Sequence, residues 1–239
     1  MKKQRLDQVL VMRKLVETRS QAENLIRLGE VQVGGQVIKK SGYFVGEDAD
    51  IQVTANERYV SRAGLKLASI AQDFALDFQG VIVLDVGSST GGFTDYALQH
   101  GAQKVIAVDV GTDQLHPKLH GDQKIELHEQ TDIRDITELS AQPDIVVIDV
   151  SFISLREILP HVARLAKQSQ IVAMLKPQFE IGMDAKHKGV IKNERIRRDI
   201  LKDFEVWVKG NFVIQNKADS KVAGTKGNQE RFYLLKATK

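Results

Sequence analysis

"LDVGSSTGGFTDYALQHGAQKVIAVDV", residues 84–110, contains two apolar runs that end in the acids Asp85 and Asp109. A turn of Gly, Ser and Thr follows the first run, and a helical pattern over 92–100 follows the turn. This order predicts a strand, a turn, a helix and a second strand. Glycines in such a turn let a ligand approach the backbone, and N–H groups at the helix start point at its polar part. The stretch therefore predicts a nucleotide-shaped site.

The alternation of strands and helices continues through the rest of the chain. Short apolar runs, typical of buried strands, are separated by helix-like segments. Strands that alternate with helices favour a parallel, doubly wound sheet, and the absence of a helix between the last two strands predicts an antiparallel edge. The predicted strands are 81–86, 104–110, a weak run at 124–129, 144–150, 170–175, 211–217 and 231–237, and the later predicted helices are 154–167 and 194–208.

The N-terminal quarter is the basic part of the chain. Residues 1–66 contain 12 Lys or Arg and 8 Asp or Glu, whereas the whole chain has a net charge of +3. Two short helices are predicted here, the second with a capping box from Ser20 to Glu23. The pair Gly34–Gly35 predicts a tight hairpin. A local positive excess is typical of a nucleic-acid-binding face, or of a solvated surface without a ligand.

Composition limits the class of protein. The chain has 239 residues, 42% of them apolar, and no cysteine. Disulfides, thiolate metal sites and Cys nucleophiles are therefore excluded, and a reducing compartment is the natural interpretation. The N-terminus is interrupted by charges every few residues, so it does not predict a signal peptide. Because the apolar runs are shorter than the roughly 18 residues of a membrane helix, we expect a soluble cytoplasmic protein.

The composition of the turn narrows the choice of ligand. Residues 87–92 read G-S-S-T-G-G, which matches neither the dinucleotide fingerprint nor a phosphate loop. An acid two residues before the first Gly, and a second acid after the next strand, resemble the S-adenosylmethionine site of Rossmann-like methyltransferases. In that arrangement the turn passes the methionine end of the cofactor and Asp109 holds its ribose. The alternative is a tight turn with a capping acid and no ligand.

Four charged residues are expected around the same crevice. Asp149 and Lys176 each end an apolar strand, Glu230 begins the last strand, and Lys66 lies on the helix before the first one. Ligand crevices open at the carboxyl ends of parallel strands, so these side chains are expected to converge. Each also has a structural alternative, as a surface lysine, a helix cap or a local ion pair.

These motifs resemble the TlyA family, historically called haemolysin A. The resemblance covers nearly the whole chain and rests on "YVSRAGLKL", "LDVGSSTGGFTD", "VDVGTDQL", "DVSFISL", "LKPQFE" and "KGNQERF". It implies an S4-like RNA-binding domain over 1–58, a linker over 59–63 and an FtsJ-like methyltransferase domain over 64–239. The implied fold class is α/β, a Rossmann-like methyltransferase with a mostly parallel sheet and an antiparallel edge strand, preceded by a small α+β RNA-binding domain.

The resemblance also implies an activity: methyl transfer from S-adenosylmethionine to a cytidine ribose 2′-hydroxyl in ribosomal RNA. The expected partners are ribosomal RNA or ribosomal subunits. By motif, the catalytic residues are Lys66, Asp149, Lys176 and Glu230. The expected cofactor-binding residues are Asp85, Gly87, Ser88, Ser89, Thr90, Gly91, Gly92, Phe93, Asp109, Val110, Asp132, Ile133 and Asp149.

Two positions depart from the family pattern. The family usually has Asn where this chain has Asp132, on the adenine side of the cofactor. It also usually carries Arg in the stretch "KLHGDQKI", where this chain has His120 and Gln123. The RNA contacts of the family are therefore not all expected to be kept in this chain. The expected RNA-binding residues are Lys2, Lys3, Arg5, Arg13, Lys14, Arg19, Arg27, Arg62, Lys186, Lys188, Arg195 and Arg198.

The residues also bear on the chemistry. Methylation at pyrimidine carbon 5 normally needs a Cys adduct, and amino-group methylation usually needs a proline turn where this chain reads "DVSF". No metal is indicated, because Pro117 breaks the helix that would align His116 with His120. The residues leave open whether Lys176 removes the hydroxyl proton or only orients the hydroxyl.

Three other functions are compatible with parts of the pattern. One is a small-molecule or protein methyltransferase whose N-terminal module only docks to ribosomes. Another is a membrane-lytic protein, as the haemolysin name suggests, although no membrane span or lytic helix is visible. The third is a non-catalytic protein that binds ribosomal RNA. RNA-dependent turnover, liposome leakage and methyl transfer would discriminate among them.

Overall fold

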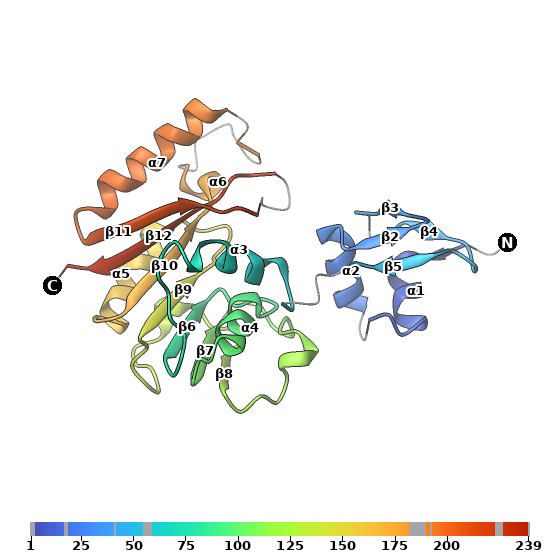
Figure 1. Cartoon of the computed structure of the whole chain (residues 1–239), viewed down its shortest axis with the longest axis horizontal. Helices are drawn as coiled ribbons and strands as arrows, with labels where there is room; N and C mark the ends of the chain where they lie inside the picture. The colour runs from blue at the N-terminus through green and yellow to red at the C-terminus, as the bar shows by residue number, and fades with distance from the viewer. Residues whose placement is uncertain are drawn as a thin grey trace. The chain divides into compact units, whose positions relative to one another are not determined.

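The computed structural model of the chain (Figure 1) describes residues 3–16, 19–40, 42–54, 59–181, 190–191, 193–222 and 227–238. The chain divides into two units. The first comprises residues 1–61 with 116–118, and the second comprises residues 62–115 with 119–239. The predicted boundaries at 58 and 64 stay a prediction, and the first helix of the second unit begins at Arg62, inside the predicted linker.

The first unit combines two helices with two small sheets. Its apolar core includes Leu6, Val9 and Ile26. A three-stranded antiparallel sheet has the order β3-β2-β5, and β1 pairs with β4. Both glycines of the hairpin turn between β2 and β3, Gly34 and Gly35, have positive φ, as a two-residue turn of this kind requires. The elements are β1 (Gln4–Arg5), α1 (Leu6–Met12), α2 (Arg19–Leu28), β2 (Val31–Val33), β3 (Gln36–Val37), β4 (Phe44–Val45) and β5 (Ile51–Val53).

Two expectations for this unit need correction. The sequence predicted one hairpin, whereas the structure adds the strands β1, β4 and β5. These strands have two or three residues each, too few for a period-2 pattern to stand out. Helix α2 begins at Arg19, so Ser20 lies within its first turn rather than at the expected cap.

The second unit is built on a seven-stranded sheet with the order β11-β12-β10-β9-β6-β7-β8. The five strands from β6 to β10 are parallel, whereas β12 is antiparallel to both β10 and β11. The predicted fold class, with its antiparallel edge, is confirmed. The strands are β6 (Ile82–Val86), β7 (Lys104–Val108), β8 (Ile125–His128), β9 (Ile145–Ile148), β10 (Gln170–Leu175), β11 (Phe212–Asp219) and β12 (Arg231–Ala237).

Helices cover both faces of this sheet. Successive residues of a strand point to opposite faces, and β12 shows the two layers. Tyr233 packs against Phe204 of α7 at a ring distance of 5.2 Å, and Phe232 packs against Phe93 of α4 at 6.2 Å. Helix α5 shares the apolar cluster of α7, and α3 packs against α4. These helices are α3 (Arg62–Ala71), α4 (Gly92–Gln99), α5 (Leu155–Leu165) and α7 (Glu194–Val208).

One edge of the sheet collects the strand ends that carry the candidate residues. Parallel strands β6, β7, β9 and β10 all finish there. Strand β12 runs the other way, and its first residue, Arg231, pairs with Leu175 at the end of β10. The segments after β9 and β10 and the segment before β12 therefore meet at this carboxyl edge, where α/β sheets bind their ligands.

Candidate active site

The turn between β6 and α4 is built around two glycines with positive φ. At Gly87, where φ is +81°, a Cβ atom would lie 2.7 Å from the backbone oxygen of Asp149. At Gly91, where φ is +85°, it would lie within 3 Å of Leu115 and Leu119. Both positions therefore exclude a side chain for two reasons, the backbone conformation and the lack of space. The turn is packed tightly on both sides.

Asp109 follows β7 and braces this turn. One carboxylate oxygen accepts a hydrogen bond from the backbone N–H of Ser89 at 2.8 Å. The other accepts from the backbone N–H of Gly111 at 2.7 Å. Each carboxylate oxygen can accept a second hydrogen bond, so Asp109 can hold the turn and still accept from a ligand. The next residue, Val110, is 71% exposed.

Asp85, near the end of β6, is a buried acid with one unpartnered oxygen. Its Oδ2 accepts from the hydroxyl of Thr94 at 2.7 Å. Its Oδ1 has no hydrogen-bond partner among the described residues, and neither does the buried hydroxyl of Ser88. Burial raises the pKa of Asp85 to about 7, against the opposing effect of the Thr94 hydrogen bond. Buried polar atoms need partners, so these orphaned atoms beside the crowded turn fit a ligand with an ammonium group.

Two ion pairs lie at the carboxyl edge. Lys176 Nζ is 2.5 Å from Asp149 Oδ1 and also donates to Ser151 Oγ at 2.7 Å. Lys66 Nζ is 2.6 Å from Glu230 Oε2. All four side chains are at most 16% exposed, so the charges are partly withdrawn from water. The structure thus joins the four predicted catalytic residues in two pairs, and Asp149 is not a helix cap because Ser154 caps α5.

Other predicted cofactor residues differ in what they offer. The side chain of Phe93 belongs to the core, at 2% exposure, so only its backbone can face a ligand. Ile133 is also buried. The carboxylate of Asp132 accepts two hydrogen bonds from the Arg134 guanidinium, at 2.7 and 3.0 Å. This contact lowers the pKa of Asp132. It uses hydrogen-bond acceptor positions on both carboxylate oxygens of this residue, which stands where the family usually has Asn.

Two residues near the ion pairs were missed by the sequence reasoning. Phe152 is 91% exposed and has φ +66°, an outlier for an aromatic residue. Its ring lies 5.1 Å from that of Phe179. The side chain of Glu180 is buried and hydrogen-bonded to the start of α5. The motifs "DVSFISL" and "LKPQFE" contain these residues. However, neither the strained backbone at Phe152 nor the contact of Glu180 with a residue 26 positions away leaves a pattern in the local sequence.

Three of the predicted RNA-binding arginines are tied into the first unit. Arg5 and Arg19 both contact the fully buried carboxylate of Asp7, at 2.8 and 3.0 Å. They hold the pKa of Asp7 well below its usual range. Arg13 donates to two backbone carbonyl groups, including that of Ala49 at 2.7 Å. These three side chains therefore stabilise the fold of the first unit. Their guanidinium groups are already engaged within it, which makes them weaker candidates for RNA contacts.

The remaining predicted RNA-binding cations divide into three groups, on the first unit, on the second unit and outside the described residues. Lys3 and Lys14 are exposed on the first unit. Lys14 has φ +56° in the C-terminal turn of α1, where the Leu15 N–H bonds to the Leu10 carbonyl. Glycine is usual at that place. Lys2, Lys186 and Lys188 lie outside the described residues, as does the side chain of Arg27, whereas Arg62 begins α3 and Arg195 and Arg198 are exposed on α7.

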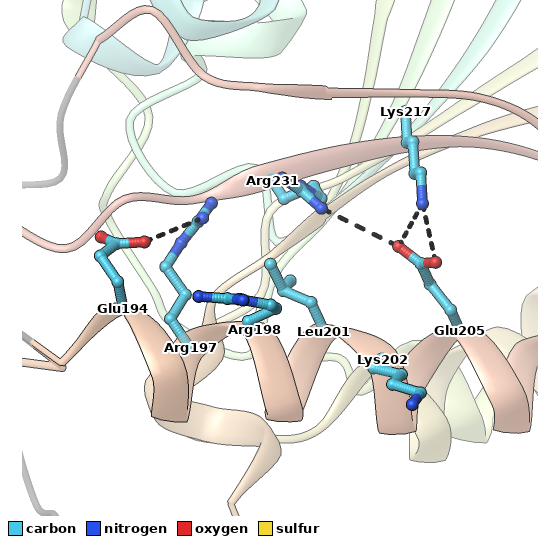
Figure 2. A pocket seen from close by; sticks show the side chains of 8 residues that line it. All are labelled: Glu194, Arg197, Arg198, Leu201, Lys202, Glu205, Lys217 and Arg231. Carbon is cyan, nitrogen blue, oxygen red and sulfur yellow. Dashed lines mark hydrogen bonds and ion pairs between the residues drawn. The ribbon is translucent and has the colours of Figure 1, made fainter.

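A polar groove of about 400 Å³ lies between α7 and strands β11 and β12. Figure 2 shows Lys217 and Arg231 reaching from the strands toward Glu205 of α7, and the shorter contact is 2.7 Å. Arg198 and Lys202 make no ion pair within the described part of the chain. The groove is therefore held together by its own ion pairs, and the surface of α7 adds the unpaired positive charge.

The described residues contain no helix that is long and apolar enough to cross a membrane.

The fold and the carboxyl edge define a Rossmann-like methyltransferase. A Gly-rich turn follows β6, an acid follows β7, and two lysine–acid pairs lie at the carboxyl edge of the sheet. The profile of the FtsJ-like methyltransferases matches residues 59–237, and that of the S4 domain matches residues 4–51. The chain belongs to the FtsJ-like methyltransferase family and carries an N-terminal S4 domain.

Named relatives agree with this assignment. The chain is 38% identical over 199 residues to the 16S/23S rRNA (cytidine-2′-O)-methyltransferase TlyA of Mycobacterium tuberculosis H37Rv, covering 81% of this chain and 74% of that protein. It is 36% identical to Hemolysin A of Brachyspira hyodysenteriae, covering 95% and 97%. A solved structure from Streptococcus thermophilus, described as a hemolysin, has 37% identity and a TM-score of 0.74, covering 100% and 90%.

Proposed function

We propose that the chain is an S-adenosylmethionine-dependent methyltransferase that modifies the ribose 2′-hydroxyl of a cytidine in ribosomal RNA. The observation that carries the proposal is the pairing of Lys176 with Asp149 and of Lys66 with Glu230 at one sheet edge. Two lysines and two acids suit the handling of a single hydroxyl proton. The relative named for cytidine-2′-O-methylation supports this substrate. We also propose a cytoplasmic location and no resident metal.

The cofactor supplies a methyl carbon made electrophilic by a sulfonium. The turn at 87–92 holds the methionine end of the cofactor, where Asp85 Oδ1 accepts a hydrogen bond from the ammonium group. Asp109 accepts hydrogen bonds from the ribose hydroxyls. Val110, Asp132 and Ile133 border the adenine. This assignment gives the unpartnered oxygen of Asp85 a donor and uses the remaining acceptor capacity of Asp109.

The residues of the ion pairs position the acceptor and manage its proton. A ribose hydroxyl is a poor nucleophile, so positioning and proton transfer both matter. The ammonium of Lys176 has three donors, and contacts with Asp149 and Ser151 use two. The third would donate to O2′ of the acceptor ribose. The bound cofactor would supply the electrophilic methyl group and keep the electron pair of its broken S–C bond. The hydroxyl proton would go to the Lys176–Asp149 pair, with Lys176 passing one proton to Asp149 as it accepts the proton from O2′.

RNA contacts come from both units in this proposal. Lys3 and Lys14 of the S4 domain, and Arg195 and Arg198 of α7, are exposed cations suited to phosphate groups. Phe152, exposed beside the ion pairs, offers a flat face on which a nucleobase can stack. Replacing Phe152 with Ala is therefore expected to raise the KM for RNA more than it changes cofactor binding.

The chemical position of the transferred methyl group tests the proposal. A methyl on O2′ blocks alkaline cleavage of the adjacent phosphodiester, so labelled ribosomal RNA should give an alkali-resistant dinucleotide. Lys176→Ala and Asp149→Ala should each lose activity by about 100-fold or more while still binding the cofactor. A substrate with 2′-deoxyribose at the target should bind and remain unmethylated. Label released on a mononucleotide would assign the methyl to a base and refute the proposal.

A further inference from the structure

We propose that Glu180 is a positioning residue of the methyl-transfer site, which fixes the contact between Asp149 and Lys176. The inference rests on the proposed function. Asp149 and Lys176 follow neighbouring strands, β9 and β10. Their contact therefore depends on how the segment 149–154 and helix α6 (Pro177–Glu180) are held relative to each other.

Glu180 joins these two segments by direct hydrogen bonds. Its Oε2 accepts from the Ser154 hydroxyl at 2.6 Å, and its Oε1 accepts from the Leu155 backbone N–H at 2.8 Å. Both donors lie at the start of α5, where the segment from Asp149 ends. Lys176 is the residue that precedes α6, and Pro177 restricts the backbone at the first position of that helix.

The segment 149–154 is joined to Lys176 and α6 at both of its ends. At one end is the Lys176–Asp149 ion pair, and at the other is the anchor from Glu180 to Ser154. The segment between Asp149 and Ser154 contains Phe152 with φ +66°. A bulky residue in that conformation is strained and stays there only when its surroundings hold it. Without the anchor, the segment can relax and carry Asp149 away from Lys176.

The burial of Glu180 indicates that it does more than cap α5. Ser154 already caps that helix, because its hydroxyl accepts from the Arg156 backbone N–H at 3.1 Å. A carboxylate that is 1% exposed is costly to bury unless it is hydrogen-bonded and paired. Arg156 Nε lies 3.6 Å from Glu180 and gives partial charge balance. The fold thus accepts a buried acid whose distinct effect is to link α6 to the segment after β9.

Three variants separate positioning from a general loss of stability. Glu180→Ala removes both hydrogen bonds. Glu180→Gln keeps an acceptor for the Leu155 N–H and a donor for the Ser154 oxygen. Glu180→Asp keeps the charge but shortens the side chain, and it serves if the Ala variant does not fold. The matched control is Ser169→Ala, which removes a buried hydrogen bond to the Pro143 carbonyl beyond the opposite end of β10.

Two measurements are made on the full-length chain. The first is the rate at which an amine-reactive reagent labels Lys176, followed by peptide mass spectrometry. The second is methyl transfer to ribosomal RNA, with the kcat, the KM for RNA and the dissociation constant of S-adenosylmethionine. We expect Glu180→Ala to speed Lys176 labelling and to lower kcat by about 10- to 100-fold, since small misplacements cost that much. KM and cofactor affinity should stay unchanged, and Glu180→Gln should restore most of the rate.

Specific results would overturn the inference. Unchanged Lys176 labelling in Glu180→Ala, or in Glu180→Asp if the Ala variant does not fold, would show that the contact does not depend on Glu180. An equal loss of rate in Ser169→Ala would assign the effect to stability. If the wild-type chain failed to methylate ribose, the proposed function would fall, whereas the labelling rates would still decide whether Glu180 holds Lys176 in place.

Discussion

The ionisation of Asp85 should control how tightly the chain binds S-adenosylmethionine. Its Oδ1 is buried without a partner, and burial raises the pKa of this carboxyl to about 7. In the proposed complex the ionised acid accepts a hydrogen bond from the cofactor's ammonium. A protonated Asp85 would lose the charge and the acceptor strength that this contact needs. Binding should therefore require the proton to leave.

The size of the effect follows from the pKa. With a pKa of about 7, the ionised fraction falls from about one half at pH 7 to about one eleventh at pH 6, and apparent affinity scales with this fraction. Affinity should therefore fall about fivefold, or about 1 kcal/mol, from pH 7 to pH 6, and about tenfold more by pH 5. An α-amino group has a pKa of about 7.7–8.0, so the cofactor keeps its positive charge throughout this range.

Calorimetric titration with the cofactor at several pH values provides the assay. Asp85→Asn should bind weakly and lose the pH dependence. The hydrogen bond from Thr94 lowers the pKa of Asp85, so Thr94→Val should move the midpoint above pH 7. A wild-type affinity that is constant between pH 5 and pH 7 would refute the reasoning, and so would an equal slope in Asp85→Asn.

The raised pKa of Asp85 makes the stability of the unliganded chain depend on pH in the direction opposite to cofactor affinity. The pKa of Asp85 is raised to about 7 from the ordinary value of 3.8, so folding takes up a proton at any pH between these two values. The stabilising contribution of this group is complete below about pH 4 and is lost as the pH rises through 7. At pH 8 a buried carboxylate is costly. Asp85→Asn should therefore raise the Tm of the unliganded chain at pH 8, although it weakens cofactor binding.

Three further predictions concern single side chains. Asp109→Ala should weaken cofactor binding by about 1–3 kcal/mol in calorimetry, because the ribose hydroxyls lose their acceptor; unchanged affinity would place the cofactor elsewhere. Lys14→Gly should stabilise the fold by about 1 kcal/mol in denaturant unfolding, since glycine relieves the positive φ, yet weaken RNA binding and its salt dependence. Arg5→Ala should lower the Tm more than Lys3→Ala, because it leaves the buried Asp7 short of a partner; equal melting temperatures would contradict this.

The fold of the second unit could be predicted because its signals are local. Its strands are apolar runs, and the turn at 87–92 carries glycines where no other residue fits. The positions of Asp149 and Lys176 followed from the rule that strand ends meet at one edge. The sequence could not show which lysine pairs with which acid. Lys66, for example, contacts Glu230 from a helix far away in the chain. Pairing is a property of the folded sheet.

The first unit shows why residue type alone does not predict an RNA contact. A basic segment was expected to present its arginines to RNA, but Arg13 donates to carbonyl groups 34 and 36 residues away. Asp7 is fully buried between Arg5 and Arg19. Arginine suits such bracing because its planar group donates several hydrogen bonds at once. Lysine is a more mobile point charge, so Lys3 and Lys14 are the better candidates for phosphate contacts.

The charge distribution at the carboxyl edge favours the proposed direction of transfer. Lys66, Asp149, Lys176 and Glu230 cancel one another's charge in two contacts. Asp109, which is assigned to the cofactor, has no ion pair among the described residues, so no such contact cancels its negative charge. That charge attracts a cofactor with a sulfonium. Methyl transfer leaves a neutral sulfur, and the attraction then weakens by the loss of one positive charge. The acids that help to bind the cofactor therefore also favour release of the spent product.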